Sequence, residues 1–331
     1  MQLKTVVGNF IKEIFARICT SILLIAVFLN WITEEEFIYA IVIVYGLRMH
    51  IMMIYAFKLY KPQLVFKMPE NIKEILSYSF YIVLAGSAGT ILLEIDKFMI
   101  PQLQHIAEVA YYSVGIYIAS VIGIPSRAMQ QIINPLTAKE LNNNNIKEVG
   151  NLYQKSSITL LIAGGLLFLL INVNVKDLYV LIDKPQYSVG VLIVLMISVS
   201  ELYKLALGSN GAILTNSKFY KVFFYLSIAM AVSVIVLNKW LIGWMGINGA
   251  ALATLIVVLV FSTIKIFYVK QKLHIQPFTE KTMKVLLLIL VMFFAFYFLD
   301  FPFHPILNIL LKTIIITIIY VLTVFKLNIS E

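Results

Sequence analysis

The residues of this chain that could do chemistry are charged side chains placed inside long apolar segments. Glu94 and Lys97 are three residues apart, and so are Glu201 and Lys204, so each pair shares one face of a helix. An ionisable side chain within a membrane span costs at least about 2.5 kcal/mol on insertion scales, so each one needs a partner or a water-filled cavity. The spacing therefore allows two interpretations: ion pairs that only lower the penalty of burial, or cations that line a cavity and bind an anion.

Two further charged residues complete the candidate site. Arg48 lies within another apolar run, and Asp96 points to a different helix face from Glu94. The candidate binding residues are Arg48, Lys97, Lys204, Glu94, Asp96 and Glu201. Lys265 is a weaker candidate, because it lies near the end of its apolar run and can extend its ammonium group to the membrane surface.

Metal and catalytic chemistry have little support in the sequence. Cys19 is the only cysteine, and the four histidines are scattered without the spacing of a zinc site. The loops that connect the apolar runs on the outer side are short. They leave no room for a domain that would bind an acceptor substrate and hold a catalytic base. We therefore expect no metal and no enzyme active site.

The elements that must position these charges are ten apolar runs, each close to the roughly 20 residues that a membrane-spanning helix needs. Of the 331 residues, 61% are hydrophobic and 13% are charged. The composition predicts an all-α integral membrane protein with about ten transmembrane helices. The runs cover residues 18–31, 37–57, 78–100, 109–131, 157–173, 189–207, 222–237, 246–267, 285–299 and 306–325.

Lys and Arg residues are concentrated in every second segment between the apolar runs. This pattern predicts the orientation of the chain in the membrane. With both termini in the cytoplasm, 18 of the 26 Lys and Arg residues lie in cytoplasmic stretches and three lie outside, as the positive-inside rule requires. The net charge of +9 is then assigned to loops that face anionic lipid, and not to nucleic-acid binding.

Two places interrupt the helical pattern. Pro125 lies within the fourth run, where it removes a backbone hydrogen bond and predicts a kink. Gly208 and Gly211 form a turn signal between the sixth and seventh runs. The eighth run opens with small residues, which let helices approach closely in lipid: Gly246, Gly249, Ala250, Ala251 and Ala253.

Four segments resemble a known family. Residues 93–100 (LEIDKFMI) and 111–127 (YYSVGIYIA followed by IPSR) look like the first two helices of the C-terminal lobe of polysaccharide flippases. Residues 216–221 (NSKFYK) and 246–254 (GINGAALAT) look like later segments of the same proteins. These are the O-antigen and capsule repeat-unit flippases of the multidrug, oligosaccharidyl-lipid and polysaccharide exporter superfamily. The motifs occur in the expected order between residues 78 and 267.

The resemblance implies a two-lobed exporter fold with an incomplete first lobe. Residues 1–67 would be the last two helices of the N-terminal lobe, 68–275 the six-helix C-terminal lobe, and 276–331 two additional C-terminal helices. Family members usually have twelve to fourteen helices, so the alignment implies that this chain lacks the first four. Lys312 would lie in the extra pair, away from the interface between lobes.

The resemblance also implies a function. A member of the family would translocate an undecaprenyl-pyrophosphate-linked oligosaccharide across the bacterial inner membrane by alternating access, for O-antigen, capsule or exopolysaccharide synthesis. Lys97, Lys204 and Arg48 would line the cavity between lobes and neutralise the pyrophosphate, and Tyr112 or Tyr117 would stack on sugar rings. No cofactor is implied; coupling to an ion gradient, with Asp96 as the candidate residue, is left open.

The partners implied are the lipid-linked oligosaccharide, membrane lipids and, less directly, a polysaccharide polymerase or other assembly proteins. Three other functions stay open from the sequence: an exporter of drugs or lipid precursors, a truncated remnant that does not transport, and a membrane-embedded glycan polymerase or ligase. The short outward loops make the last of these the weakest alternative.

Overall fold

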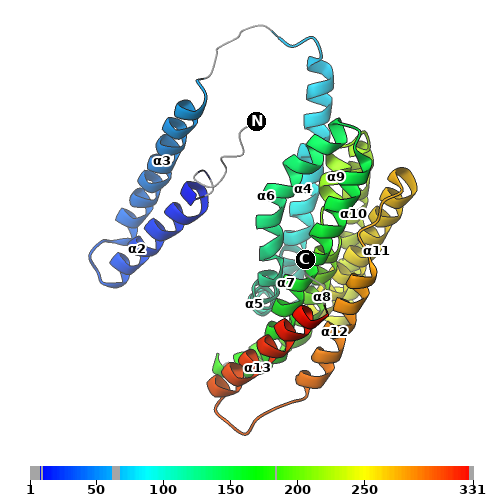
Figure 1. Ribbon diagram of the computed structural model, residues 1–331. Helices are drawn as coiled ribbons and strands as arrows, with labels where there is room; N and C mark the ends of the chain where they lie inside the picture. The colour runs from blue at the N-terminus through cyan, green and yellow to red at the C-terminus, as the bar shows by residue number, and fades with distance from the viewer. Residues whose placement is uncertain (1–7, 9, 62–67, 183–184, 328–331) are drawn as a thin grey trace. The chain divides into compact units, whose positions relative to one another are not determined.

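A computed structural model describes residues 8, 10–61, 68–182 and 185–327, and every regular element in these ranges is a helix (Figure 1). The N-terminal elements are a π-helix, Phe10–Phe15, followed by α2 (Ala16–Phe28) and α3 (Glu34–Leu59). The remaining elements are α4 (Ile72–Leu103), α5 (Ala107–Ser120), the 3₁₀ turn η2 (Val121–Gly123), α6 (Ile124–Asn142), α7 (Ile146–Leu181), the 3₁₀ turn η3 (Pro185–Val189), α8 (Gly190–Ala206), α9 (Asn210–Thr215), α10 (Tyr220–Met245), α11 (Ile247–Leu273), α12 (Glu280–Tyr297) and α13 (Pro305–Lys326).

Eight helical segments in the described part of the chain are long and apolar enough to cross a membrane. They comprise α3, the first part of α4, the segment from α5 to α6, α7, η3 with α8, α10, α11 and α13. The two other apolar runs lie in α2, which has 13 residues, and in α12, which begins with three charged residues within its first five. The chain is thus an all-α protein with the helices of a multi-pass membrane protein.

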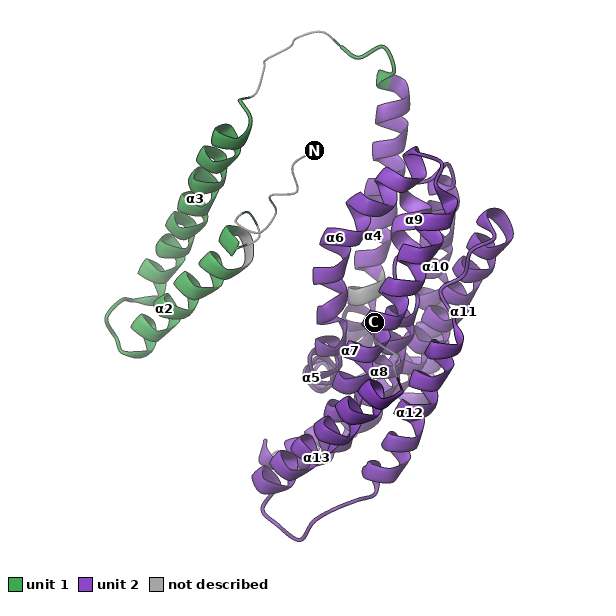
Figure 2. Cartoon of the chain, in the orientation of Figure 1, with its two compact units in different colours: residues 1–72 green, residues 73–331 purple. Residues whose placement is uncertain are grey.

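The helices form two compact units, residues 1–72 and residues 73–331 (Figure 2). In the first unit α2 packs against α3, whose N-terminus is closed by a capping box between Thr33 and Glu36. The second unit contains α4 to α13, and both C-terminal helices pack on α7. The structure therefore groups residues 276–331 with the six preceding helices in one unit.

Helix α7 is the central element of the second unit. It contacts α6, α8, α12 and α13, and sixteen of its residues are buried. Gly164 and Gly165 let neighbours approach closely, because a Cβ atom at Gly165 would lie 2.8 Å from Tyr320 Oη. Lipid gives little hydrophobic drive between helices, so this close packing is the main source of their association.

The small-residue face at the start of α11 is confirmed as a packing surface. Gly249, Ala250, Ala251 and Ala253 are buried, and a Cβ atom on Gly249 would overlap the backbone of Leu241 in α10. Glycine is therefore required at this contact between α11 and α10.

The fourth apolar run, residues 109–131, is divided into two helices by a 3₁₀ turn that ends just before Ile124 and Pro125. Helix α5 ends at Ser120, the turn η2 follows, and Pro125 lies in the first turn of α6, where a missing backbone donor is tolerated. A second special turn follows α8, where Gly208 has a φ of +52°. A Cβ atom at Gly208 would lie 2.6 Å from both Ser156 Oγ and Ser157 N of α7.

A buried ion network fixes α13 to α7. The Lys312 side chain is 1% exposed, and its ammonium lies 3.1 Å from Asp177 of α7 and 2.7 Å from Asp300 before α13. Asn308 donates to the second Asp177 oxygen at 3.1 Å. Lys312 is thus held by two carboxylates, which explains how a charged residue can lie in the middle of an apolar helix face.

Candidate functional site

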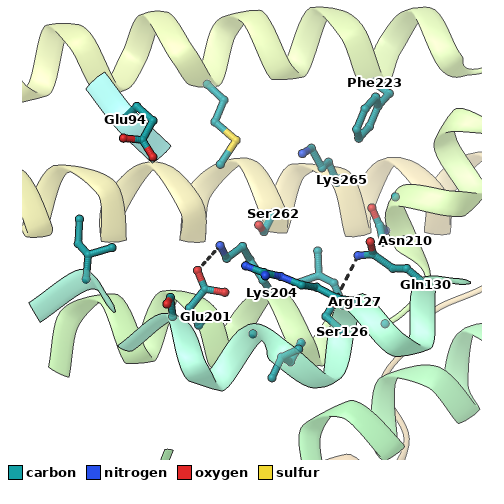
Figure 3. A pocket seen from close by; sticks show the side chains of 18 of the residues that line it. Glu94, Ser126, Arg127, Gln130, Glu201, Lys204, Asn210, Phe223, Ser262 and Lys265 are labelled. Atoms are coloured by element: carbon teal, nitrogen blue, oxygen red, sulfur yellow. Dashed lines mark hydrogen bonds and ion pairs between the residues drawn. The ribbon is translucent and has the colours of Figure 1, made fainter. Parts of the chain in front are cut away.

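The second unit contains an open cavity of about 560 Å³ whose walls come from α4, α5, η2, α6, α8, α9, α10 and α11 (Figure 3). Its wall includes four cations and two carboxylates. These charged residues are Lys97, Arg127, Lys204 and Lys265, together with Glu94 and Glu201. A charged hollow inside an apolar helical bundle is what a polar ligand needs in order to enter a membrane protein.

The two ion pairs expected from spacing are confirmed. Lys97 Nζ lies 2.9 Å from Glu94, and Lys204 pairs with Glu201. The pairs are not sealed in the core, because the Lys204 side chain is 36% exposed and that of Glu94 is 60% exposed. Each lysine is therefore partly neutralised and still accessible from the cavity.

Two cations of the cavity were missed or given little weight by the sequence analysis. Arg127 counted as a residue of a cytoplasmic stretch, and Lys265 as one that reaches the membrane surface. Both line the cavity, and Lys265 Nζ lies 5.1 Å from the centre of the Phe223 ring. Among the described residues neither cation has a carboxylate within 4 Å, so the formal charge of the side chains that line the cavity is +2.

The signal that could have found Arg127 is its spacing. Most of the α5, η2 and α6 residues that line the cavity follow one another at intervals of three or four. Five of the seven are Tyr117, Ser120, Gly123, Arg127 and Gln130, and the other two, Ile116 and Ser126, are each next to one of these. A Cβ atom on Gly123 would lie 2.9 Å from Glu201 Oε2, so this glycine lets the η2 turn approach the ion pair of α8.

The cations lie at different depths. Lys97 lies six residues from the end of α4, and Lys265 lies eighteen residues after the start of α11. At 1.5 Å per residue, Lys97 lies about 9 Å from the C-terminal end of α4. Lys265 lies about 27 Å from the N-terminal end of α11. The cations of the cavity wall are therefore spread along the helices and not gathered at one point.

Neutral polar groups supplement the charges. Asn210 is 2% exposed and lines the cavity, and its Nδ2 donates to Tyr153 Oη at 2.6 Å. Its Oδ1 has no hydrogen-bond partner in the described part of the chain. Gln130 of the same cavity donates to Ser126 Oγ at 3.0 Å. The cavity thus offers hydrogen bonds as well as charge.

Asp96 lies outside this cavity, in a polar cluster of its own. It is 2% exposed, and accepts hydrogen bonds from Tyr112 Oη of α5, Asn238 Nδ2 of α10 at 2.5 Å and Thr254 Oγ1 of α11 at 3.0 Å. Three neighbouring helices thus each give one donor to a single buried carboxyl group. The different helix face expected for Asp96 relative to Glu94 is confirmed, because only Glu94 lines the cavity.

The cluster corrects one expectation about aromatic residues. Tyr112 is fully buried and bonded to Asp96, so it cannot stack on a ligand in the cavity. Tyr117 is 65% exposed, lines the cavity and lies under Lys97, with 5.4 Å from Nζ to the ring centre. The role of Asn238 could not be predicted from the sequence, because an isolated asparagine in an apolar run does not indicate its hydrogen-bond partner.

Arg48 lies in the first unit, in α3, with its guanidinium 5.3 Å from the centre of the Tyr45 ring. Arg48 is not among the residues that line the cavity of the second unit. Among the described residues no group of three or more His, Cys, Asp and Glu side chains could hold a metal ion.

Comparison of the chain with models of protein families, with curated proteins and with solved structures gives no match. The candidate site is therefore interpreted from its own chemistry.

Proposed function

We propose that the protein is a transporter that moves an undecaprenyl-pyrophosphate-linked oligosaccharide across the bacterial inner membrane. The observation that carries this proposal is the charge of the cavity, where four cations face two carboxylates inside an apolar bundle. A pyrophosphate group brings two phosphates that Lys and Arg side chains bind with charge-assisted hydrogen bonds. The sugars would meet the neutral donors and acceptors of Asn210, Gln130 and Ser126.

The same charge favours this substrate over the main alternative within transport. A cationic drug would be repelled by a wall with net charge +2, because Coulomb terms are stronger in a cavity than in water. An anionic lipid precursor would be accepted, so the charge defines the class of headgroup and not the sugar.

The proposed mechanism is alternating access in a two-lobed exporter fold with about ten spans, in which unit 1 contributes to the first lobe and unit 2 forms the second. The headgroup would occupy the cavity while the lipid tail stays in the bilayer. No bond is made or broken, so the protein would not be an enzyme. Asp96 is the proposed coupling residue, since the charge of a buried carboxyl group at a junction of four helices depends on ion or proton binding.

Translocation in proteoliposomes tests the proposal. The substrate is a fluorescent isoprenyl-pyrophosphate oligosaccharide, and its transfer between leaflets is measured by quenching from outside. We expect the variant Arg127→Gln/Lys265→Gln to lose most of the transfer, whereas Lys218→Gln/Lys272→Gln, which removes two lysines that do not line the cavity, keeps it. Equal transfer by the two variants would refute an anion-binding role of the cavity.

The proposed location in the inner membrane, with both termini cytoplasmic, has a separate test. A reporter that is active only outside the cytoplasm, fused after Lys326, should be silent, because the basic stretches then stay inside. Strong activity of that fusion would reverse the proposed orientation.

A further inference from the structure

A second concave region lies in the same unit, away from the cationic cavity. It has a volume of about 850 Å³ and is formed by the first half of α7 and the start of α12. It shares no lining residue with the first cavity. Its chemistry is therefore not explained by the proposed transport of the oligosaccharide.

The polarity of this groove changes along one face of α7. The lining residues recur at helical spacing, with Asn151, Gln154 and Lys155 at the polar end and Ile158, Ile162 and Ala163 farther along. The thirteen residues from 151 to 163 extend about 18 Å, which is twelve steps of 1.5 Å. A groove of this length, polar at one end and more apolar at the other, matches the upper part of a phospholipid, with its headgroup followed by the first segment of an acyl chain.

The charge of the polar end is predominantly positive. Lys155 and Lys281 line it, together with the carboxylate of Glu280 in the first turn of α12. A smaller hollow of about 490 Å³ adjoins it, since both include Asn151 and Gln154, and that hollow adds Lys147 and Lys270. Four lysines thus surround the polar end, against two carboxylates: Glu280, which lines it, and Glu148, which accepts a hydrogen bond from Asn151 at 2.9 Å.

We propose that this groove binds an anionic phospholipid, with the phosphate near Lys155 and Lys281 and one acyl chain along Ile158, Ile162 and Ala163. Basic pockets between membrane helices on the cytoplasmic side are suited to anionic headgroups. The site joins α7 to α12, so a bound lipid stabilises the attachment of the C-terminal helices to the rest of the unit. This proposal does not depend on what the first cavity transports.

Native mass spectrometry of the purified full-length chain tests the site. The protein is titrated with phosphatidylglycerol and, as a reference, with phosphatidylcholine that has the same acyl chains. We expect the wild type to prefer phosphatidylglycerol and Lys155→Gln/Lys281→Gln to bind it about tenfold more weakly or worse. The matched control Lys272→Gln/Lys284→Gln removes two exposed lysines of the same region that line neither hollow, and should keep the preference.

Two further measurements separate a lipid site from simple attraction of anions. Ala163→Phe fills the apolar part of the groove and should weaken phosphatidylglycerol binding while all charges stay in place. Inorganic phosphate should neither compete with the lipid nor raise the melting temperature of the protein. Equal losses in the control pair, or unchanged binding by Ala163→Phe, would overturn the proposal. Melting curves without added lipid show whether each variant is folded.

Discussion

Lys312 and Lys204 are both lysines within apolar helices, and the structure accommodates them in opposite ways. Lys312 is 1% exposed and held by two carboxylates from different elements. Lys204 has one partner, three residues away on its own helix, and its side chain is 36% exposed in a cavity with an excess of cations. A charge that is fully compensated by the fold has little left to offer a ligand, whereas a partly compensated charge at a cavity wall can bind one.

The largest expected effect tests the compensated lysine. Lys312→Met leaves Asp177, whose side chain is only 15% exposed, without its cation, and we expect a loss of about 3 kcal/mol of unfolding free energy. Unfolding of the purified protein in detergent or bilayers measures it. The double variant Lys312→Met/Asp177→Asn should recover most of the loss, while Lys326→Met, in the exposed last turn of the same helix, serves as the control. If the Lys312→Met single variant is as stable as the wild type, Lys312 and Lys204 do not differ in how much the fold depends on their ion pairs.

The partly compensated lysines should respond in the opposite way. We expect Glu201→Gln/Lys204→Gln and Glu94→Gln/Lys97→Gln to stay folded, because no uncompensated charge is left behind. Each should bind an isoprenyl pyrophosphate at least about tenfold more weakly, since a hydrogen bond to a charged group contributes about 1.5–3 kcal/mol. Calorimetric titration measures the affinity. Normal affinity and transport in both double variants would make these pairs structural only.

Asp96 is a third arrangement, a buried carboxyl group surrounded by neutral donors. We expect Asp96→Asn to keep the packing and to reduce the stimulation of transport by an ion gradient about fivefold or more. Transport in proteoliposomes with and without the gradient measures this ratio. Tyr112→Phe, which removes one donor and keeps the carboxyl group, is the matched control and should retain part of the stimulation. Full stimulation in Asp96→Asn would exclude this residue from coupling.

The smallest expected effect concerns the shape of the cavity wall. Pro125→Ala should lower stability by only about 0.4–1 kcal/mol, because the proline restricts the unfolded chain and lies where no backbone donor is needed. Transport should fall more than protein abundance if η2 and the first turn of α6 must hold Gly123 against Glu201. Wild-type transport by this variant would leave Pro125 a purely structural residue.

Much of the helical architecture was predictable from the sequence. Nine of the ten apolar runs lie largely within one helix each, and the fourth spans α5, η2 and α6. Long apolar segments favour helices because a helix satisfies its own backbone groups. The pairing of Glu94 with Lys97 and of Glu201 with Lys204 was equally accessible, since it depends only on spacing within one helix.

Which residues come together in each site depends on contacts between helices. The hydrophobic periodicity of the sequence cannot predict these contacts. Asp96 meets Asn238 and Thr254, residues 142 and 158 positions away in the chain, and Lys312 meets Asp177 at a separation of 135. Arg127 and Lys265 look like surface cations in a hydropathy pattern, yet both line the cavity. The sequence by itself determined which segments are helices and which charges pair within a turn. Only the tertiary structure decided which charges are compensated and which face a cavity, because that depends on how the helices rotate and pack against one another.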